Sequence, residues 1–388
     1  MTNGAHHRFG RPRTRGVTLV EVLIALLLGL VLVAATLAVL LSTSRTNDTL
    51  SALVRTQEAG RLALLLVERD VRMAGYRGCA FGIINTLLDE GSASYRDALY
   101  DFNAPVFGLT QAQHGTIPEG LLGDDFDDLY ARGGILVVKS AAAPMNLALA
   151  RDVERNDDAV VITNAAQLPI GQLVLINDCS GGGDLFQIAT DDPLPSDRIE
   201  RNAGADGIVP GNVDPGSGAF SRYYEAEETE LLAAESNVYY VGFQRSPDGT
   251  VLANTCLRRV RMGRRVGGVP LDEELVEGVF DMRIQYGVDV NADSQADRYE
   301  AADAITGDAW EDVVSVRVGV LAYSGAGVAT PPLGEDYEIP FDETLWDFPD
   351  DQEVIDAQGA GDEKRMLPPD ANLYRFFSTT VAARNRVP

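Results

Sequence analysis

The sequence predicts an α+β protein in which a long N-terminal helix packs on a large, mainly antiparallel β-rich domain. Residues 17–41 form an unbroken apolar run, and no proline occurs between Val17 and Tyr76. After Cys79, β-branched or alternating runs are separated by Gly, Asp and Asn, a pattern typical of strands and turns. We therefore divide the chain into a leader (residues 1–16), a helix (17–78) and a β-rich globular domain (79–388).

The charge of the chain limits its partners. The 388 residues carry a formal net charge of -26, with 45% apolar residues. An acidic body of this kind repels a phosphate backbone, which argues against direct nucleic-acid binding.

Residues 17–41 are predicted to span a membrane. The run has 25 residues, and Glu21 is its only charged residue. A helix of this length reaches about 37 Å, which exceeds the hydrocarbon core of about 30 Å. Four arginines within residues 8–15 should hold the leader on the cytoplasmic side, so we expect the globular domain on the opposite side.

Glu21 is unusual because a carboxylate inside a membrane span is costly. One interpretation is a charge tolerated near the end of the helix. The other is a carboxylate that pairs with a cation, such as a new amino terminus at Val17 of its own or a neighbouring chain.

The run RGVTLVEVLIALLLG resembles the class III signal of type IV prepilins. The resemblance implies that a prepilin peptidase cuts after Gly16 and methylates the amino group of Val17. It also implies that Glu21, at the fifth mature position, takes part in subunit docking. The family most often has Phe at the first mature position, so Val17 departs from its pattern.

The helix is expected to continue past the membrane as an amphipathic segment that lies on a sheet. Apolar residues recur at spacings that can share one face, and Gly75 and Gly78 supply the stop. These apolar residues are Leu50, Leu53, Val54, Leu62, Leu65, Leu66 and Met73.

Strands are predicted to dominate the rest of the chain, with one short helix at Asp272–Val276. Residues 80–130 and 324–370 are expected to be irregular surface segments, since they are rich in Gly, Pro and acidic residues. The predicted strands are Ile135–Lys139, Ala159–Thr163, Gln172–Asn177, Leu185–Ala189, Val238–Phe243, Val251–Cys256, Leu257–Met262, Val279–Val288, Val313–Tyr323 and Phe376–Ala382.

The segment 289–300 has the spacing of a twelve-residue calcium loop. Oxygen-bearing side chains occupy positions 1, 3, 5, 9 and 12, and position 7 offers a backbone carbonyl. Ser294 stands where the sharp turn prefers Gly, and the flanks read as strand, so a solvated acidic turn is the alternative. The predicted ligands are Asp289, Asn291, Asp293, Gln295, Asp297 and Glu300.

The three cysteines leave several states open. A disulfide between Cys79 and Cys179 would tie the helix end to the sheet and close a loop of about a hundred residues. Spacing alone cannot choose among the three possible pairings, and a fully reduced state is a further alternative. We interpret Cys256 as a buried free thiol.

No catalytic constellation is evident, and we expect a structural, non-enzymatic protein. His114 is the only histidine outside the leader, and no nucleophile pattern lies near it. The arginines of residues 257–265 are interpreted as balancing the acidic surface, with a docking patch as the alternative.

Four further segments resemble PilW-type minor pilins: RDVRMAGYRGC, NDCSGGGDLFQ, YGVDVNADSQADRYE and FFSTTVAARNR. The resemblance implies a protein that primes type IV pilus assembly at the inner membrane and then lies at or near the pilus tip. Its implied partners are other minor pilins, the major pilin, the prepilin peptidase and the inner-membrane assembly platform. The alternatives are a type II secretion pseudopilin and an unprocessed, membrane-anchored periplasmic protein that binds calcium or adheres to surfaces.

Overall fold

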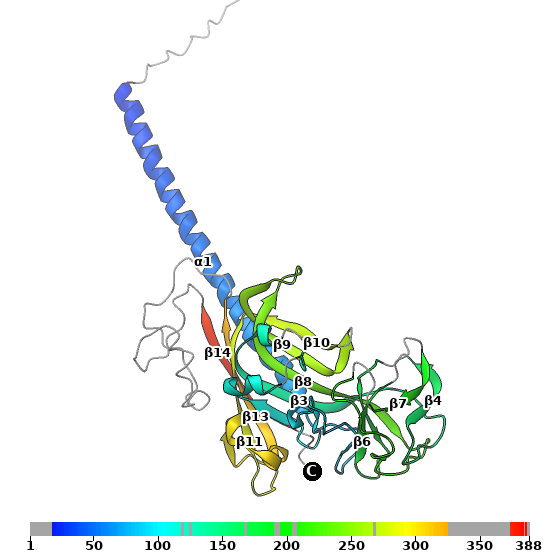
Figure 1. Ribbon diagram of the computed structural model, residues 1–388. Coiled ribbons are helices and arrows are strands. Elements are labelled where there is room, and N and C mark those ends of the chain that lie inside the picture. Colours follow the sequence, from blue (N-terminus) through cyan, green and yellow to red (C-terminus); the bar gives the residue numbers. More distant parts are fainter. Residues whose placement is uncertain are drawn as a thin grey trace, which may run out of the picture.

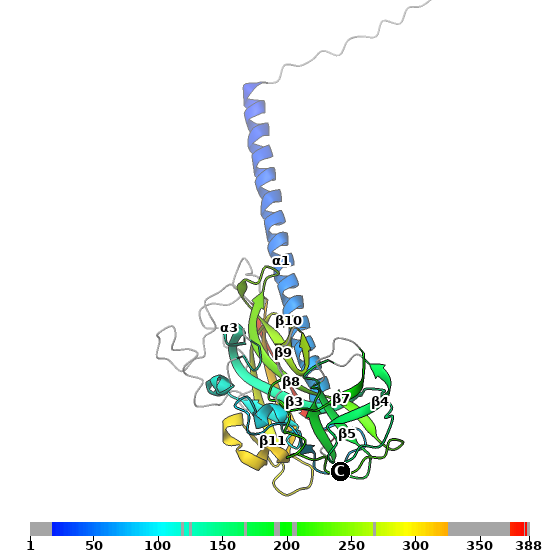
Figure 2. The ribbon, with the colours of Figure 1, turned by 45° about the vertical axis from the view of Figure 1, so that its right-hand side comes forward.

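A single long helix carries the rest of the chain at its C-terminal end (Figures 1 and 2). The computed structural model describes residues 18–117, 120–123, 126–166, 169–189, 195–203, 208–266, 269–324, 373–383 and 385. Helix α1 (Leu19–Met73) has 55 residues, which corresponds to about 82 Å. Its N-terminal half stands clear of the β-rich domain, so the predicted fold class is confirmed.

The larger of the sheets is built around β8, which pairs with β3 along one edge and with β5 and then β9 along the other. The strand order is β1-β6-β5-β8-β3-β2, with β9 and β10 continuing from β8. Its strands are β1 (Asn85–Thr86), β2 (Val106–Leu109), β3 (Tyr130–Pro144), β5 (Leu173–Asn177), β6 (Gly183–Gln187), β8 (Glu230–Arg245), β9 (Val251–Val266) and β10 (Val269–Glu277).

A second, antiparallel sheet packs against the first, and a small two-stranded sheet lies to one side (Figure 1). The second sheet has the order β12-β11-β13-β14, with β11 (Val279–Val288), β12 (Arg298–Glu300), β13 (Val313–Tyr323) and β14 (Tyr374–Ala382). The small sheet pairs β4 (Ala159–Ala166) with β7 (Ser196–Glu200).

Both faces of the large sheet are buried. Along β3, Leu136 and Val138 enter a core shared with α1 and the second sheet, whereas Ile135 and Val137 face a separate core. Residues of the 80–130 segment, such as Leu99 and Tyr100, cover that second core. The expectation that residues 80–130 form a surface segment is therefore wrong, because their scattered apolar side chains close one face of the sheet.

The described part of that segment contains short elements. Besides the strands β1 and β2 they are α2 (Asp97–Tyr100), the 3₁₀ helix η1 (Gln111–Thr116) and α3 (Phe126–Leu129). Two further 3₁₀ helices, η2 (Ala302–Ala304) and η3 (Gly307–Asp312), lie between β12 and β13. Apolar residues without a regular period gave no signal of burial in the sequence.

The C-terminal half of α1 packs on β13 and β14 through small residues, as the buried face Ala52, Thr56, Ala59, Gly60, Ala63, Leu64, Val67 and Val71 shows. A Cβ on Gly60 would lie 2.1 Å from the Phe377 ring, so the helix approaches the sheet closely. The predicted apolar face is wrong: Leu50, Val54 and Leu65 are more than half exposed. Leu66 alone of that set packs against the core.

The helix ends as the sequence predicts, and other boundaries shift. Ala74 caps it, and Gly75 follows with φ 74°, a left-handed conformation that favours glycine. Residues 272–276 lie within β10 and pair with β9, so the predicted short helix is wrong. The two strands predicted over residues 251–262 form the single strand β9, and the predicted excursion 324–370 lies almost wholly outside the described residues.

Candidate functional site

The N-terminal end of α1 is capped by Thr18 together with the side chain of Glu21. Glu21 accepts hydrogen bonds from the backbone N–H and the hydroxyl of Thr18, both at 3.1 Å, and donates its N–H to Thr18 Oγ1. This reciprocal arrangement is a capping box. Gly16 and Val17, the predicted processing residues, lie outside the described residues. The predicted docking carboxylate thus serves as a helix cap within the single chain.

Among the residues that the structure describes, none buries the most apolar part of the first half of α1. Its most apolar 18-residue stretch is 0% buried, and it is long and apolar enough to cross a membrane. An exposed apolar surface of this size needs lipid or other protein around it.

The C-terminal half of α1 is joined to the large sheet through Asp70. Its carboxylate accepts hydrogen bonds from Asn237 Nδ2 at 3.0 Å and from the hydroxyl of Tyr239. Arg259 Nη1 lies 3.4 Å from the same oxygen, and Nη2 of Arg259 pairs with Glu273. Burial first, and then the Asp70 charge, raise the pKa of Tyr239. Asp70 therefore fixes the helix on strands β8 and β9.

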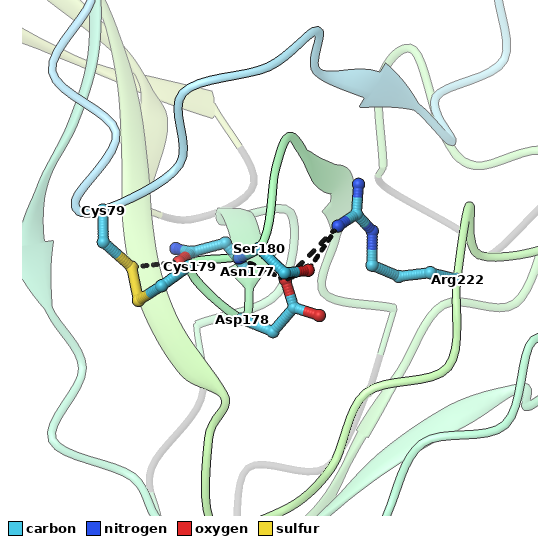
Figure 3. Close-up of a disulfide and its surroundings, with 6 residues drawn as sticks. All are labelled: Cys79, Asn177, Asp178, Cys179, Ser180 and Arg222. Carbon is cyan, nitrogen blue, oxygen red and sulfur yellow. Dashed lines mark hydrogen bonds and ion pairs between the residues drawn. A yellow bond between two sulfur atoms is a disulfide. The ribbon is translucent and has the colours of Figure 1, made fainter.

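A disulfide joins Cys79, just after α1, to Cys179, just after β5 (Figure 3). The Cα atoms are 4.9 Å apart, and the two residues are 100 positions apart in sequence. Both cysteines are exposed, and Cys179 has φ 60°. Of the pairings that the sequence left open, the structure contains this one, and Cys256 is free and buried.

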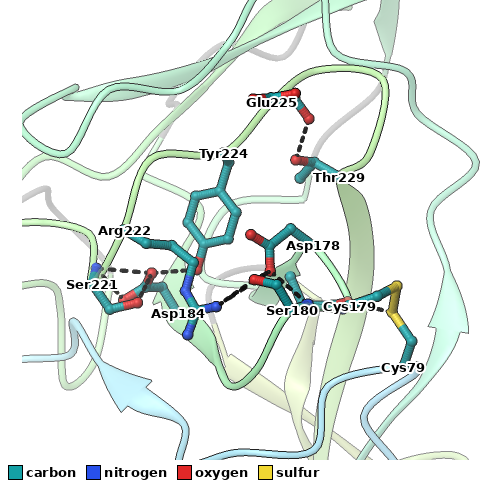
Figure 4. Close-up of polar contacts among 11 residues, drawn as sticks. Cys79, Asp178, Cys179, Ser180, Asp184, Ser221, Arg222, Tyr224, Glu225 and Thr229 are labelled. Carbon is teal, nitrogen blue, oxygen red and sulfur yellow. Dashed lines mark hydrogen bonds and ion pairs between the residues drawn. A yellow bond between two sulfur atoms is a disulfide. The ribbon is translucent and has the colours of Figure 1, made fainter.

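Polar contacts hold the turn that carries Cys179 (Figure 4). Asp178 accepts from the hydroxyl of Ser180 at 2.7 Å and lies 3.4 Å from Arg222 Nη1. Burial acts to raise the pKa of Asp178, but the hydrogen bonds from Ser180 and the Arg222 charge outweigh it, so this pKa lies below its ordinary value. The fully buried Asp184 accepts from Tyr224 and Ser221.

These contacts make the SGGGD segment a structural turn. Gly82 and Gly182 meet backbone to backbone, since a Cβ on Gly182 would lie 1.8 Å from the carbonyl oxygen of Ile83. The chain after Cys79 is therefore fixed against the chain after Cys179 by both the disulfide and close packing.

The acidic loop 289–300 joins β11 to β12 and folds around two of its carboxylates. Asp289 accepts hydrogen bonds from the N–H groups of Asn291, Asp293 and Ser294. Asp297 accepts from Val290 N at 2.8 Å and from the side chain of Asn291 at 3.1 Å.

Other predicted ligands of the loop have local partners. Asp293 Oδ1 accepts from the N–H of Gln295, and Glu300 pairs with Arg298 at 2.8 Å. Ser294 takes φ 65°, so the sharp turn forms without the glycine that this position prefers. Burial acts to raise the pKa of Asp289, but the backbone N–H groups lower it below its ordinary value.

The loop brings hard oxygen donors together without a compact carboxylate cluster. In the part of the chain that the structure describes, no three His, Cys, Asp or Glu side chains are placed to share a metal ion. Asp289 uses three acceptor positions of the four that a carboxylate offers. To bind in this loop, a metal ion would have to bring the other side-chain oxygen atoms of residues 289–300 closer together.

Three arginines of β9 pair with carboxylates of the described residues. Arg258 contacts Asp272 at 2.9 Å, Arg259 contacts Glu273 at 2.7 Å, and Arg261 contacts Glu235. These cross-strand pairs agree with the interpretation that the arginines balance acidic residues.

His114 and Cys256 have structural surroundings. The His114 ring stacks on Tyr130 with centroids 4.5 Å apart. Burial raises the pKa of the Cys256 thiol to about 12, which keeps it protonated at neutral pH. The sequence interpretation missed Asp70 and the buried Lys139, because a lone charged residue in an apolar pattern does not reveal its partner.

Two family models match the chain. Residues 238–385 match the model described as Type IV Pilus-assembly protein W, and residues 11–37 match the prokaryotic N-terminal methylation motif. No curated protein and no solved structure matches the chain. The first match runs from β8 to β14, and the second covers the leader and the start of α1.

The matches confirm the resemblance to a PilW-type, prepilin-like pilin. Together they support a type IV pilus minor pilin, a structural class that works with other pilins and the membrane pilus machinery. The methylation motif and the single apolar helix fit anchoring in the inner membrane and later incorporation into the pilus.

Proposed function

We propose that this protein is a PilW-type minor pilin that primes type IV pilus assembly at the inner membrane and enters the filament at or near its tip. The observation that carries the proposal is a 55-residue helix whose apolar half is exposed and whose other half is fixed on a large folded body. Such a molecule can leave the bilayer only if other apolar surfaces replace the lipid.

Two contacts make the helix and the body one mechanical unit. Asp70 joins the helix to the large sheet, and the Cys79–Cys179 disulfide holds the segment that follows the helix. Force applied to the helix would therefore reach the folded body directly.

The intact mass and N-terminal sequence of protein from its own membranes test the processing step. We expect a chain that begins at Val17 with a methyl group on its amino nitrogen. A chain that begins at Met1 or Thr2 would overturn the filament proposal and favour the unprocessed, membrane-anchored alternative.

Substitutions of Glu21 separate docking from capping. Glu21→Gln keeps an oxygen that can accept from Thr18, whereas Glu21→Ala removes the cap as well. We expect both variants to insert into the membrane and both to be depleted in sheared pili, because docking needs the negative charge. Glu228→Ala, an exposed carboxylate change on the body, is the control. Normal incorporation of Glu21→Gln would show that Glu21 acts as a cap only.

Pilus counts test priming, and immunogold labelling tests the position at the tip. A deletion strain should lose most pili and twitching motility, and gold particles should mark filament ends. Normal pilus numbers with loss of secreted enzymes would instead identify a type II secretion pseudopilin. Label along the whole shaft would contradict the tip position.

We also propose that the loop 289–300 binds calcium in the assembled or secreted protein. Support comes from its hard oxygen donors and from the alternating spacing of Asp289, Asn291 and Asp293 along a tight turn. Calcium-dependent thermal stability is the measurement that tests it.

A further inference from the structure

A half-open cavity lies where the segment after the disulfide meets α2, β6 and η3. Its volume is about 580 Å³, large enough for a long side chain and part of its backbone. It is lined by Ile83, Ile84, Asn85, Thr86, Glu90, Tyr95, Asp97, Tyr100, Asp101, Phe102, Asn103, Leu185 and Asp308.

Aromatic rings form one wall of the cavity. Tyr95 and Tyr100 stack with centroids 5.7 Å apart, and Tyr100 and Phe102 are buried. Tyrosine and phenylalanine faces attract cations as well as apolar groups.

Two exposed apolar residues belong to the segment that borders the cavity, and Phe81 precedes the lining residue Ile83 by two positions. Ile83, which lines it, is 82% exposed, and Phe81 is 75% exposed. They are the most exposed large apolar residues of the described body outside α1. The contact between Gly82 and Gly182 and the nearby disulfide fix this segment, so little conformational entropy is lost when a partner binds.

The cavity carries carboxylates that form no ion pair with any residue that the structure describes. Glu90, Asp97, Asp101 and Asp308 line it, and within the described residues none of them forms an ion pair. This differs from β9 and β10, where the carboxylates face arginines.

The nearest cations are directed elsewhere. Lys139 lies beneath α2, fully buried, and its Nζ donates to the carbonyl oxygens of Asp97 and Ala98 at 3.0 and 2.9 Å. Arg96 donates to the carbonyl oxygens of Ala93 and Tyr95. Burial, and then the charges of Glu90, Asp97 and Asp101, raise the pKa of Tyr95, so three carboxylates act on one hydroxyl in the cavity wall.

We propose that this cavity and the adjoining Phe81 and Ile83 form a docking site for a basic segment of another protein. An arginine or lysine side chain enters between the carboxylates and the tyrosine rings, and apolar residues beside it cover Phe81 and Ile83. Charge complementarity selects the basic partner, and the exposed apolar pair favours a protein segment over a small free cation. The inference holds whether or not the chain enters a filament.

Photocrosslinking in the full chain tests the proposal. Benzoylphenylalanine replaces Phe81, and Leu252, which is 40% exposed on β9, is the control position. After irradiation of cells that make the protein, we expect a crosslink at position 81 to one partner, at a peptide with Arg or Lys within a few residues. The position 252 probe should not form it.

Neutralising the cavity supplies the decisive comparison. Glu90→Gln, Asp97→Asn and Asp308→Asn together should reduce the crosslink at least fivefold, and Asp308→Asn alone should reduce it in part. Asp97→Arg combined with an acidic substitution of the partner's basic residue should restore it. Retained disulfide and an unchanged melting temperature verify that the variants fold.

Three results would each overturn the proposal. They are a crosslink at position 81 no stronger than at position 252, a crosslinked peptide without a basic residue, and an undiminished crosslink in the neutralised variant. The last result would assign the surface to apolar contact alone.

Discussion

At the scale of single residues, burial has a larger effect on the pKa of Lys139 than the nearby carboxylates have. Lys139 follows the apolar run Ile135–Val138 in β3 and is 0% exposed. Burial lowers its pKa to about 7, although Asp101 and Asp97 act in the opposite direction. The unfolded chain therefore binds a proton that the folded chain releases between about pH 7 and pH 10.5.

This lysine should make the protein more stable as the pH rises above 7. Protons bind more strongly to the unfolded state there, so the free energy of unfolding should gain up to about 1.4 kcal/mol per pH unit from this group. Lys139→Met keeps the length without the charge and should abolish that gain. Denaturant unfolding of the full chain in detergent, from pH 7 to pH 8.5, measures the difference.

The comparison of unfolding free energies between wild type and Lys139→Met stops at pH 8.5, because other groups titrate above this pH. The unfolded Cys256 thiol ionises near pH 9.0, whereas its folded pKa is about 12, so this cysteine lowers stability as the pH rises further. A wild-type protein whose stability has the same slope as Lys139→Met would show that the lysine is hydrated when folded.

The calcium loop is also tested at the level of single residues. Millimolar calcium should raise the melting temperature of the full chain, and at a hundredfold excess over Kd the gain is about 2.7 kcal/mol. Asp293→Asn should remove the gain while keeping the turn, because within the described loop the Asp293 carboxylate accepts only the N–H of Gln295. Asp289→Asn also weakens the turn, so it is the less specific variant.

The control for calcium is Asp303→Asn, an exposed carboxylate change just beyond the loop. It should retain the full effect of calcium. If calcium leaves the wild-type melting temperature unchanged, the loop is a solvated acidic turn.

At the scale of elements, α1 is held by close approach and by one carboxylate rather than by large apolar side chains. Its small residues let the helix backbone lie near β13 and β14. Asp70 then receives donors from β8 and β9. Leu50, Val54 and Leu65 are exposed, and neighbouring chains or lipid can cover them.

Removing the Asp70 carboxylate should loosen the helix from the sheet. Asp70→Ala removes the acceptor of Tyr239 and Asn237 and one of the carboxylates that contact Arg259. The free energy of unfolding should fall by roughly 3 kcal/mol. Asp70→Asn should cost less, because its amide oxygen still accepts. Hydrogen exchange of residues 59–73 and denaturant unfolding measure the effect.

Asp48→Ala is the matched control on the same helix, since Asp48 is exposed. It should leave both measurements within about 0.5 kcal/mol of wild type. Equal losses from Asp48→Ala and Asp70→Ala would refute a specific role for Asp70.

At the scale of the whole molecule, the disulfide connects regions that are built separately. It links the end of α1 to the turn between β5 and β6, next to the side region that contains β4 and β7. That region has its own core, which includes Val160, Ile199 and Phe220. The disulfide thus ties the helix to a part of the body whose own core contains no residue of α1.

Replacing both cysteines by serine should lower the free energy of unfolding by up to about 4.7 kcal/mol, the chain-entropy value for a loop near a hundred residues. Both side chains are exposed, so little packing is lost. Reduction of the wild type should reproduce the loss, and the double variant should not respond to the reductant. A reductant effect of equal size in the variant would show that Cys256 or another group is responsible.

Elements that depend on local pattern can be predicted from the order of residues alone. The membrane-length helix, its glycine stop and strands such as Val279–Val288 and Val313–Tyr323 follow from unbroken apolar runs, left-handed glycine and β-branched residues. The acidic loop spacing and the N-terminal signal are equally local.

Which surfaces are buried and which charges meet depends instead on how the elements pack in three dimensions. The helix buries alanines and glycine because the sheet approaches it closely. The periodicity of apolar residues along a helix does not predict how near a sheet will pack. Cys79 and Cys179 are far apart in the chain, and so are Asp70 and its hydrogen-bond donors. The four carboxylates of the cavity also come from separate segments. Such contacts depend on the packing of whole elements, so the order of residues alone cannot specify them.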